Sequence, residues 1–436
     1  MTIQPGLAEW IAGEAISFAL QTPTSLDAAT DRLMAGLGPG VRLLALGEAL
    51  HGSEEILLIR NRMFQRLAEQ HGFSAVVLET SSPQARAANE YVLGERGRSD
   101  AGVEGWLASG FGLAEANREL VDWMRGYNTG TAGARATTLR LYGFDLPLGQ
   151  GGLASPGGVL DIALRYLERV DAARAAPHRQ RITALVGDPA EWERPAAMFD
   201  PAQAIGLEPR ARDLRIACLD LITELRIRRP AYTLRTDPLG YADALHHAEL
   251  GRKLLDAHAA LATPGAYTTM LGIRDLIMAD NVLHVLDLER TRGKVLVFAA
   301  SGHLKRSTVQ WRLPPGDDVK EWWPAGSHLT QAVGAGYAVI GMALGASEPN
   351  GVALAEPGTI EAALGDAGGC LLLPTHRGRG LPAPEIERAP VRSGSALNPT
   401  YAPLTLDSFS DFDWLVFVDA ATYPRGLPPL TAWSAG

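Results

Sequence analysis

Short apolar runs, each closed by a polar residue or a glycine-rich turn, recur along this chain and alternate with longer segments of helical periodicity. A run of this length, bounded by turn residues, is typical of a strand buried on both faces. Strands that alternate with helices predict an α/β fold, with a central, largely parallel sheet flanked by helices. The runs lie at residues 41–46, 75–78, 139–143, 294–300, 337–344 and 414–418.

The strand pattern stops between about residues 155 and 274, where the sequence is rich in Ala, Leu and Arg. Apolar residues recur there at helical spacing, as in Ile216, Leu219, Ile222 and Leu225. This change predicts a mostly helical insertion in the α/β core. We expect residues 1–150 to form the first part of the core with the catalytic motifs, 151–270 the insertion, and 271–436 the second part of the core.

Composition excludes several kinds of partner. The 40 Lys and Arg residues stand against 49 Asp and Glu, a net charge of −9, which argues against binding to nucleic acid. No apolar run approaches the length of about 20 residues that a membrane span needs. Cys218 and Cys370 are too few for a disulfide framework or a four-cysteine zinc site. Glu9 and Glu14 lie inside the N-terminal apolar stretch, which therefore does not fit a signal peptide. The low cysteine count and this N-terminus predict a cytoplasmic protein.

Four ionisable side chains lie at or just beyond the ends of four predicted strands: His51, Glu79, Asp145 and His303. In open α/β sheets, ligands bind at the carboxyl ends of the strands. We therefore expect these side chains to share one site. The alternative is that any polar residue after a strand reaches this edge without a shared role.

The turn after the first strand is the densest of these positions. Glu48 and His51 are three residues apart and His51 and Glu55 four apart, so a helical turn would project all three from one face. A histidine held by carboxylates can act as a general base on water. Glu54 and Glu55 also suit the start of a helix, where acidic residues are favourable. Arg60 is a candidate for stabilising an oxyanion, although a solvated surface arginine is the commoner case.

The other candidates are weighed in the same way. Glu79 follows a buried run, and a buried carboxylate is rarely left without a partner. His303 follows Gly302, which lets the backbone approach a ligand closely. Neither Ser53 nor Ser301 lies in a G-x-S-x-G nucleophile motif, and the chain has no G-x-G-x-x-G after a strand, no P-loop and no H-E-x-x-H.

Glu48, His51, Glu55, Arg60 and Glu79 occur together in LLALGEALHGSEEILLIRNRMFQRLAEQHGFSAVVLET, which resembles the opening motif of the erythromycin esterase family. That motif combines a G-E-x-x-H-G turn, a following Glu, an Arg nine residues past the His, and a Glu at the end of the next strand. The resemblance extends through LVDWMRGYN, LYGFDLP, IRDLIMADN, SGHL and FDWLVFVDAAT, from about Leu7 to Pro424. The motif positions are filled by Glu48, His51, Gly52, Glu55, Arg60 and Glu79.

The resemblance implies hydrolysis of an ester or macrolactone by a water that a histidine activates directly, without an acyl-enzyme. Carried over, His51 is the base, Glu48 and Glu79 orient it or the water, and Arg60 with His303 holds the carbonyl. We expect no cofactor and a small-molecule substrate. Because the expected site is acidic, it should favour a neutral or cationic ester or lactone. Further residues expected to bind substrate are Glu55, Asp145, Ser301 and Arg274.

Two positions depart from the family pattern, and two alternatives follow. Ala300 replaces the first histidine of an H-x-x-H ending, and Leu50 stands where a small polar residue is common. The first alternative is a non-hydrolytic enzyme of a biosynthetic pathway, catalysing a cyclisation or an elimination, or an enzyme of altered specificity. The second is a hydrolase that uses a divalent metal ion, with a ligand set of Glu48, His51, Glu79 and His303.

Overall fold

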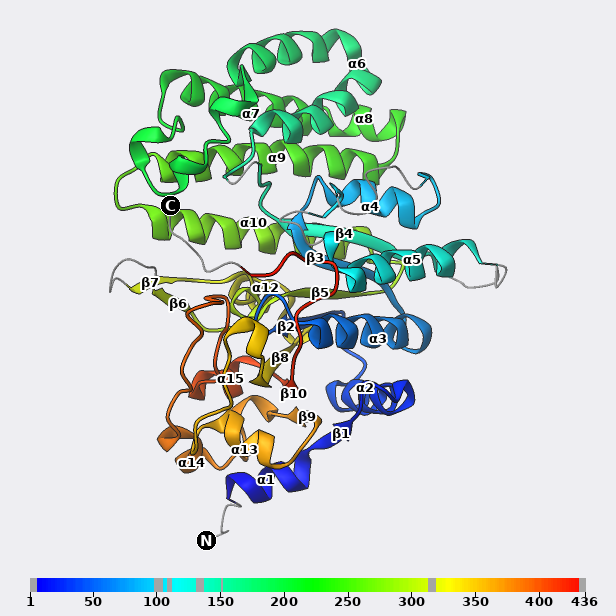
Figure 1. The fold of residues 1–436 in the computed structure, drawn as a ribbon. Helices are drawn as coiled ribbons and strands as arrows, with labels where there is room; N and C mark the ends of the chain where they lie inside the picture. The colour runs from blue at the N-terminus through cyan, green and yellow to red at the C-terminus, as the bar shows by residue number, and fades with distance from the viewer. Residues whose placement is uncertain are drawn as a thin grey trace. The chain divides into compact units, whose positions relative to one another are not determined.

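A computed structural model describes residues 6–97, 105–107, 112–130, 137–149, 152–312 and 319–430 (Figure 1). The chain divides into two compact units. The first comprises residues 1–80, 85–143 and 285–436, and the second comprises 81–84 and 144–284. The helical stretch expected at 151–270 lies within the second unit, and the expected boundary at 150/151 falls outside the described residues.

The core of the fold is an eight-stranded mixed sheet, largely parallel as the sequence predicts. Strands β10, β8, β2, β5 and β3 run parallel, and β1 and β9 add an antiparallel edge. The order across the sheet is β1 (Ile16–Phe18), β9 (Cys370–Pro374), β10 (Trp414–Ala420), β8 (Tyr337–Ala346), β2 (Leu43–Glu48), β5 (Lys294–Ala300), β3 (Phe73–Ser81) and β4 (Arg140–Asp145).

Each strand predicted from an apolar run is present. β5 has the predicted bounds, whereas β3 continues to Ser81, so Glu79 lies inside the strand instead of after it. The apolar pattern did not predict β1 and β9, which are short, nor a separate hairpin of β6 (Val309–Arg312) and β7 (Val319–Trp322). Edge strands and hairpins of three to five residues are too short for their periodicity to stand out.

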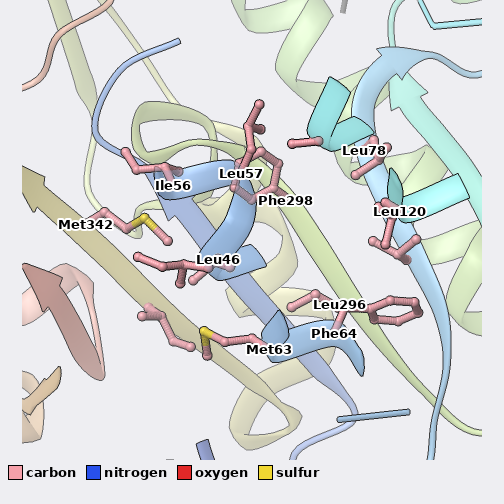
Figure 2. Packing of buried hydrophobic residues seen from close by; sticks show 14 of the residues in the cluster. Leu46, Ile56, Leu57, Met63, Phe64, Leu78, Leu120, Leu296, Phe298 and Met342 are labelled. Atoms are coloured by element: carbon pink, nitrogen blue, oxygen red, sulfur yellow. The ribbon is translucent and has the colours of Figure 1, made fainter. Parts of the chain in front are cut away.

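Alternate residues of the central strands enter one apolar cluster, because successive side chains of a strand point to opposite faces. Figure 2 shows Leu46 of β2, Leu296 and Phe298 of β5, and Met342 of β8 in this cluster. The residues between them, such as Ala45 and Val297, are buried as well. The sheet is therefore covered on both faces, as expected for a largely parallel sheet.

Helices of the first unit pack against this sheet, and the helix that follows β2 positions the site. Helix α3 (Glu54–Gln70) begins at Ser53, whose hydroxyl oxygen accepts the Ile56 N–H at 3.2 Å. It packs against α2 and α5. The helices of this unit are α1 (Leu7–Glu14), α2 (Pro23–Leu37), α3, α4 (Ala85–Val92), α5 (Glu115–Thr129), α11 (Ser301–Leu304), α12 (Ala325–Val333), α13 (Ile360–Asp366), α14 (Ala383–Arg388) and α15 (Leu406–Asp411).

The second unit is helical, and α6, α7 and α9 pack side by side in it (green in Figure 1). Ile222 and Leu225 of the predicted apolar repeat are buried in its core with Cys218, whereas Ile216 and Leu219 are about half exposed. None of the described helices is both long and apolar enough to cross a bilayer. The helices are α6 (Pro156–Val186), α7 (Pro209–Ile227), α8 (Arg229–Arg235), α9 (Pro238–Leu261) and, up to residue 284, α10 (Tyr267–Leu288).

Candidate functional site

Three neighbouring parallel strands bring the central candidates together. Glu48 is the last residue of β2, and it is paired in register with Ala300, the last residue of β5. Glu79 lies near the end of β3, on the other side of β5. His303 follows β5 in the short helix α11, and His51 lies in the turn after β2. The carboxyl ends of these strands meet at one edge, as predicted from the position of these residues after apolar runs.

Glu48 holds the imidazole of His51 directly. Its Oε1 atom lies 2.6 Å from Nδ1 of His51. A carboxylate only accepts hydrogen bonds, so Nδ1 carries the proton and Nε2 is the basic nitrogen of the neutral ring. Glu48 is buried and His51 is about one quarter exposed. This contact therefore sets the tautomer that a general base needs.

Glu79 lies between the two imidazoles. Its Oε1 atom is 3.4 Å from Nε2 of His303 and 4.0 Å from Nε2 of His51. Its Oε2 atom accepts the backbone N–H of Ala300 at 2.8 Å. The carboxylate is fixed from the backbone side, and its other oxygen faces both rings.

The turn that carries His51 has a backbone conformation that glycine favours. Gly52 has a φ of +95°, and a Cβ atom at this position would lie 3.1 Å from Cε2 of Tyr423 and 3.4 Å from Oδ1 of Asn350. The expectation of a helical turn is wrong, because Glu48 is in a strand and α3 begins only at Glu54. Glu48 meets His51 through this tight turn instead.

Buried amides from distant loops fix the same turn. The side-chain amide of Asn398 donates to the carbonyl oxygen of His51 at 2.8 Å, and that of Asn350 donates to the carbonyl oxygen of Gly52 at 2.8 Å. The two amides are joined by a 2.8 Å hydrogen bond, and the His51 N–H donates to the Thr400 hydroxyl at 3.0 Å. These residues carry no catalytic motif and stand roughly 300 or more positions away, so no sequence signal identified them.

Arg60 is a buried cation and not a solvated one. It is 1% exposed, and its guanidinium lies 4.9 Å from the centre of the Phe298 ring. Within the described part of the chain, its hydrogen bonds go only to Oδ1 of Asn61, at 3.0 and 2.6 Å. Burial lowers the pKa of Arg60 to about 10, against the opposing effect of the Glu48 charge, so it remains a cation at neutral pH.

A cavity that is open to solvent adjoins this cluster within the first unit. Glu48, Glu79 and Arg60 are its charged lining residues. The walls are mostly apolar and include Leu57 and Phe298, which Figure 2 labels. Charged groups and an apolar wall therefore meet in one cavity next to the cluster that contains His51.

Two expected site residues, Glu55 and Ser301, have other surroundings. Both carboxylate oxygens of Glu55 bind Thr422, one the backbone N–H at 2.7 Å and the other the hydroxyl at 2.8 Å. The hydroxyl of Ser301 is buried, packs against Gly47, and has no hydrogen-bond partner in the described structure. Ser53 caps α3, so neither serine is hydrogen bonded to His51.

Asp145 and Arg274 belong to the second unit. They form a two-pronged ion pair with N–O distances of 2.9 and 2.8 Å. The Asp145 carboxylate also accepts the Leu146 N–H at 2.7 Å and is buried. The expectation that these residues bind substrate remains a prediction.

Three of the four residues named as metal ligands come close together. Glu48, His51 and Glu79 can each offer one ligand atom, with all three atoms within 4.8 Å of one another. His303 is not part of this compact set among the described residues. A His and two carboxylates are an acceptable donor set for a divalent ion, but Nδ1 of His51 is already occupied by Glu48.

Comparison with known proteins identifies the family of this chain. The family model described as erythromycin esterase matches residues 68–420, well over half of the chain. A relative from Escherichia coli, erythromycin esterase type II, is 24% identical over 343 residues, covering 77% of this chain and 76% of the relative.

Solved structures share the fold at low sequence identity. A Bacillus cereus protein has a TM-score of 0.74 at 18% identity, covering 97% of this chain and 98% of its own. A succinoglycan biosynthesis protein has a TM-score of 0.72 at 16% identity, covering 98% and 100%. A mutant of erythromycin esterase EreC in its open conformation has a TM-score of 0.69 at 19% identity, covering 94% and 98%.

Proposed function

Because this chain belongs to the erythromycin esterase family, we propose that it opens a carboxylic ester or lactone with a water molecule activated by His51, without an acyl-enzyme. The observation that carries the proposal is the 2.6 Å contact between Glu48 and Nδ1 of His51 beside a cavity that also contains Arg60. Family membership supports an ester hydrolase. The assignments of His51 as the base and of the substrate go beyond family membership and are part of this proposal.

The distances favour water as the nucleophile. Nε2 of His51 and Oε1 of Glu79 are 4.0 Å apart, and a water about 2.8 Å from each atom fits this gap at a bent angle. As Nε2 takes a proton from this water, the water oxygen bonds to the carbonyl carbon and the carbonyl oxygen becomes an oxyanion. Arg60 and His303 stabilise that charge, and Glu48 stabilises the imidazolium.

Collapse of the tetrahedral intermediate completes the reaction. The oxyanion re-forms the carbonyl, the bond to the leaving oxygen breaks, and the proton on His51 passes to that oxygen. The products are an alcohol and a carboxylic acid, which ionises at neutral pH. In a lactone both groups remain on one opened chain. Because the two carboxylates near His51 outnumber Arg60, a neutral or cationic ester is the expected substrate.

The test uses the purified protein with a panel of esters and lactones that includes erythromycin. His51→Ala should reduce ester hydrolysis at least about 10³-fold, because the base is removed. His376→Ala is the control and should retain activity, because this exposed residue follows β9, whose end pairs with the start of β10, away from the carboxyl ends of the parallel strands. Hydrolysis by the His51→Ala variant at the wild-type rate would refute the assignment of the base.

A metal-dependent hydrolase is the second candidate, favoured by the close approach of Glu48, His51 and Glu79. A bound divalent ion would supply an activated water. Elemental analysis of the purified protein, together with activity before and after EDTA treatment, separates the two candidates. Loss of activity on chelation, with recovery on adding one divalent ion, would replace the metal-independent mechanism.

A non-hydrolytic reaction is the third candidate, motivated by Ala300 at a position where the family pattern has a histidine. Ala300 lies at the end of β5, and its N–H already contacts Glu79. The Ala300→His variant should be tested on macrolides. New macrolide hydrolysis in the variant alone would indicate that the natural protein acts on a different substrate.

A further inference from the structure

The segment that follows β10, residues 421–427, crosses the beginning of α3; we call it the C-terminal strap. The Thr422 carbonyl oxygen accepts the Glu54 N–H at 3.1 Å, and the backbone N–H and hydroxyl of Thr422 donate to the Glu55 carboxylate. Gly426 has a φ of +88°, and a Cβ atom there would lie 2.4 Å from the carbonyl oxygen of Leu113. The strap is therefore held in one defined path.

Arg425 makes hydrogen bonds and ion pairs that hold the strap in place. Its backbone N–H and its Nε atom donate to the two oxygens of Glu54, at 3.0 and 2.8 Å. Its other guanidinium nitrogens contact Glu115 at 3.0 Å and Glu119 at 3.2 Å on α5. Glu54 is buried, so Arg425 supplies the charge that a buried carboxylate requires. Arg425 thus ties the strap to the helix start that follows the His51 turn.

The strap forms part of the wall of the site cavity. Pro424 and Leu427 line it, together with walls that include Leu57, Leu107 and Phe298. Leu427 packs against the main apolar cluster of the first unit and is partly exposed. Because an apolar side chain at a cavity wall admits or excludes groups by volume, Leu427 is placed to select for substituent size.

The charge in the cavity indicates which half of an ester occupies it. Arg60 is the one cation among the described residues that line the cavity, beside the carboxylates of Glu48 and Glu79. Hydrolysis leaves a carboxylate on the acyl half, whereas the alcohol half leaves neutral. A buried cation stabilises a carboxylate and the oxyanion that precedes it. The apolar walls suit a hydrocarbon substituent on the same carbonyl carbon.

We propose that this cavity holds the apolar acyl part of the ester, that Leu427 limits the size of this acyl group, and that Arg425 is a positioning residue that keeps Leu427 in the wall. This inference rests on the proposed ester hydrolysis and names the acyl specificity of the same site. It gives the C-terminal strap a role in substrate selection.

The first experiment compares p-nitrophenyl acetate, butyrate and octanoate as substrates. Leu427→Trp should lower kcat/KM for the octanoate relative to the acetate by about tenfold or more, because the larger side chain fills the cavity. Leu427→Ala should shift the preference toward the octanoate. The matched control is Leu406, which is 47% exposed on α15, changed to Trp and Ala. An unchanged acyl preference in both Leu427 variants would overturn the proposal.

The second experiment tests Arg425. Arg425→Ala should raise KM for the butyrate and octanoate several-fold with a smaller change in kcat, and Arg425→Lys should restore part of the loss. Arg226→Ala, which breaks an exposed ion pair with Glu249, is the control. An equal loss of kcat for all three esters, with KM unchanged, would show a structural role and refute positioning.

Binding of the product acids separates this inference from the proposed function. Calorimetric titration with sodium acetate and sodium octanoate requires no turnover. Octanoate should bind wild-type protein more tightly than acetate, and Leu427→Trp should remove that difference. If no ester is hydrolysed but this binding pattern holds, the proposed reaction fails and the acyl cavity stands. Equal binding of octanoate by wild type and Leu427→Trp would refute the acyl cavity.

Discussion

The Nδ1 atom of His51 lies 2.6 Å from Oε1 of Glu48, although the two residues belong to a turn and a strand and not to one helix. The short turn between them folds the imidazole back over the strand end. The geometry gives His51 a fixed tautomer and leaves its other nitrogen on the side of Glu79.

Glu48→Gln should show whether Glu48 orients His51 or binds substrate. A glutamine side chain can present its amide N–H to Nδ1, which would place the proton of the ring on Nε2, the wrong nitrogen for a base. We expect kcat to fall by about 10² to 10⁴-fold with little change in KM. Steady-state kinetics measure both constants. A variant with a raised KM and an unchanged kcat would show that Glu48 binds substrate instead.

Asn398→Ala should weaken the support of the His51 turn. The substitution leaves the His51 carbonyl oxygen and Oδ1 of Asn350 without this donor, at a cost of about 1–3 kcal/mol in the free energy of unfolding. We expect kcat to fall about tenfold or more, because the base is less well placed. Asn128→Ala removes similar amide contacts, to Val92 and Leu139, and serves as the control. An equal loss of kcat in both variants would contradict this role.

Gly52→Ala should damage activity as well as stability. A side chain at a φ of +95° costs about 1–2 kcal/mol, and its Cβ atom would press on the Tyr423 ring. Gly72→Ala is a matched control, because Gly72 has a φ of +73° and a Cβ atom there would meet nothing within 4 Å. Thermal unfolding should show a loss of stability in both variants, and assays should show loss of kcat in the Gly52 variant alone.

Arg60→Met should stabilise the fold and remove activity. Burial lowers the pKa of Arg60 to about 10, so the charged form is disfavoured in the folded state at every pH below about 10. This penalty is about 3 kcal/mol and is relieved only as the pH rises above about 10. Urea unfolding at pH 7 should show a higher free energy of unfolding for Arg60→Met than for the wild type. Arg62→Met, which loses an ion pair to Asp27, should show no gain.

His258 should make the second unit sensitive to mild acid. Burial lowers the pKa of His258 to about 4, with the hydrogen bond to the Ala154 carbonyl oxygen opposing the shift. The unfolded chain therefore binds the extra proton first, and stability falls as the pH decreases from about 6.5 to 4, by up to about 3 kcal/mol. His258→Gln should reduce this pH dependence. Tryptophan fluorescence measures the stability of both proteins against pH. The same pH dependence in the two proteins would contradict the assignment.

Local pattern was enough to predict the sheet interior and the residues at its edge. Apolar runs and their closing polar residues specified β2, β5 and β8, because buried parallel strands need nearly continuous apolar sequence. Parallel strands also align their carboxyl ends. For this reason His51, Glu79, Asp145 and His303 were expected near one another. In the structure Glu79 contacts His303 and lies 4.0 Å from His51, whereas Asp145 pairs with Arg274.

The contacts that turn this edge into a site depend on segments far apart in the chain. Asn398 reaches His51 across 347 positions, and Arg425 reaches Glu54 across 371. Neither contact leaves a periodicity or a spacing in the sequence, because Asn398 and Arg425 lie outside helices and strands. The same reason explains why Glu55 was expected in the site and instead binds Thr422. Sequence determined which residues end the strands, and tertiary packing decided which of them meet, since only the folded backbone brings distant loops within hydrogen-bond distance.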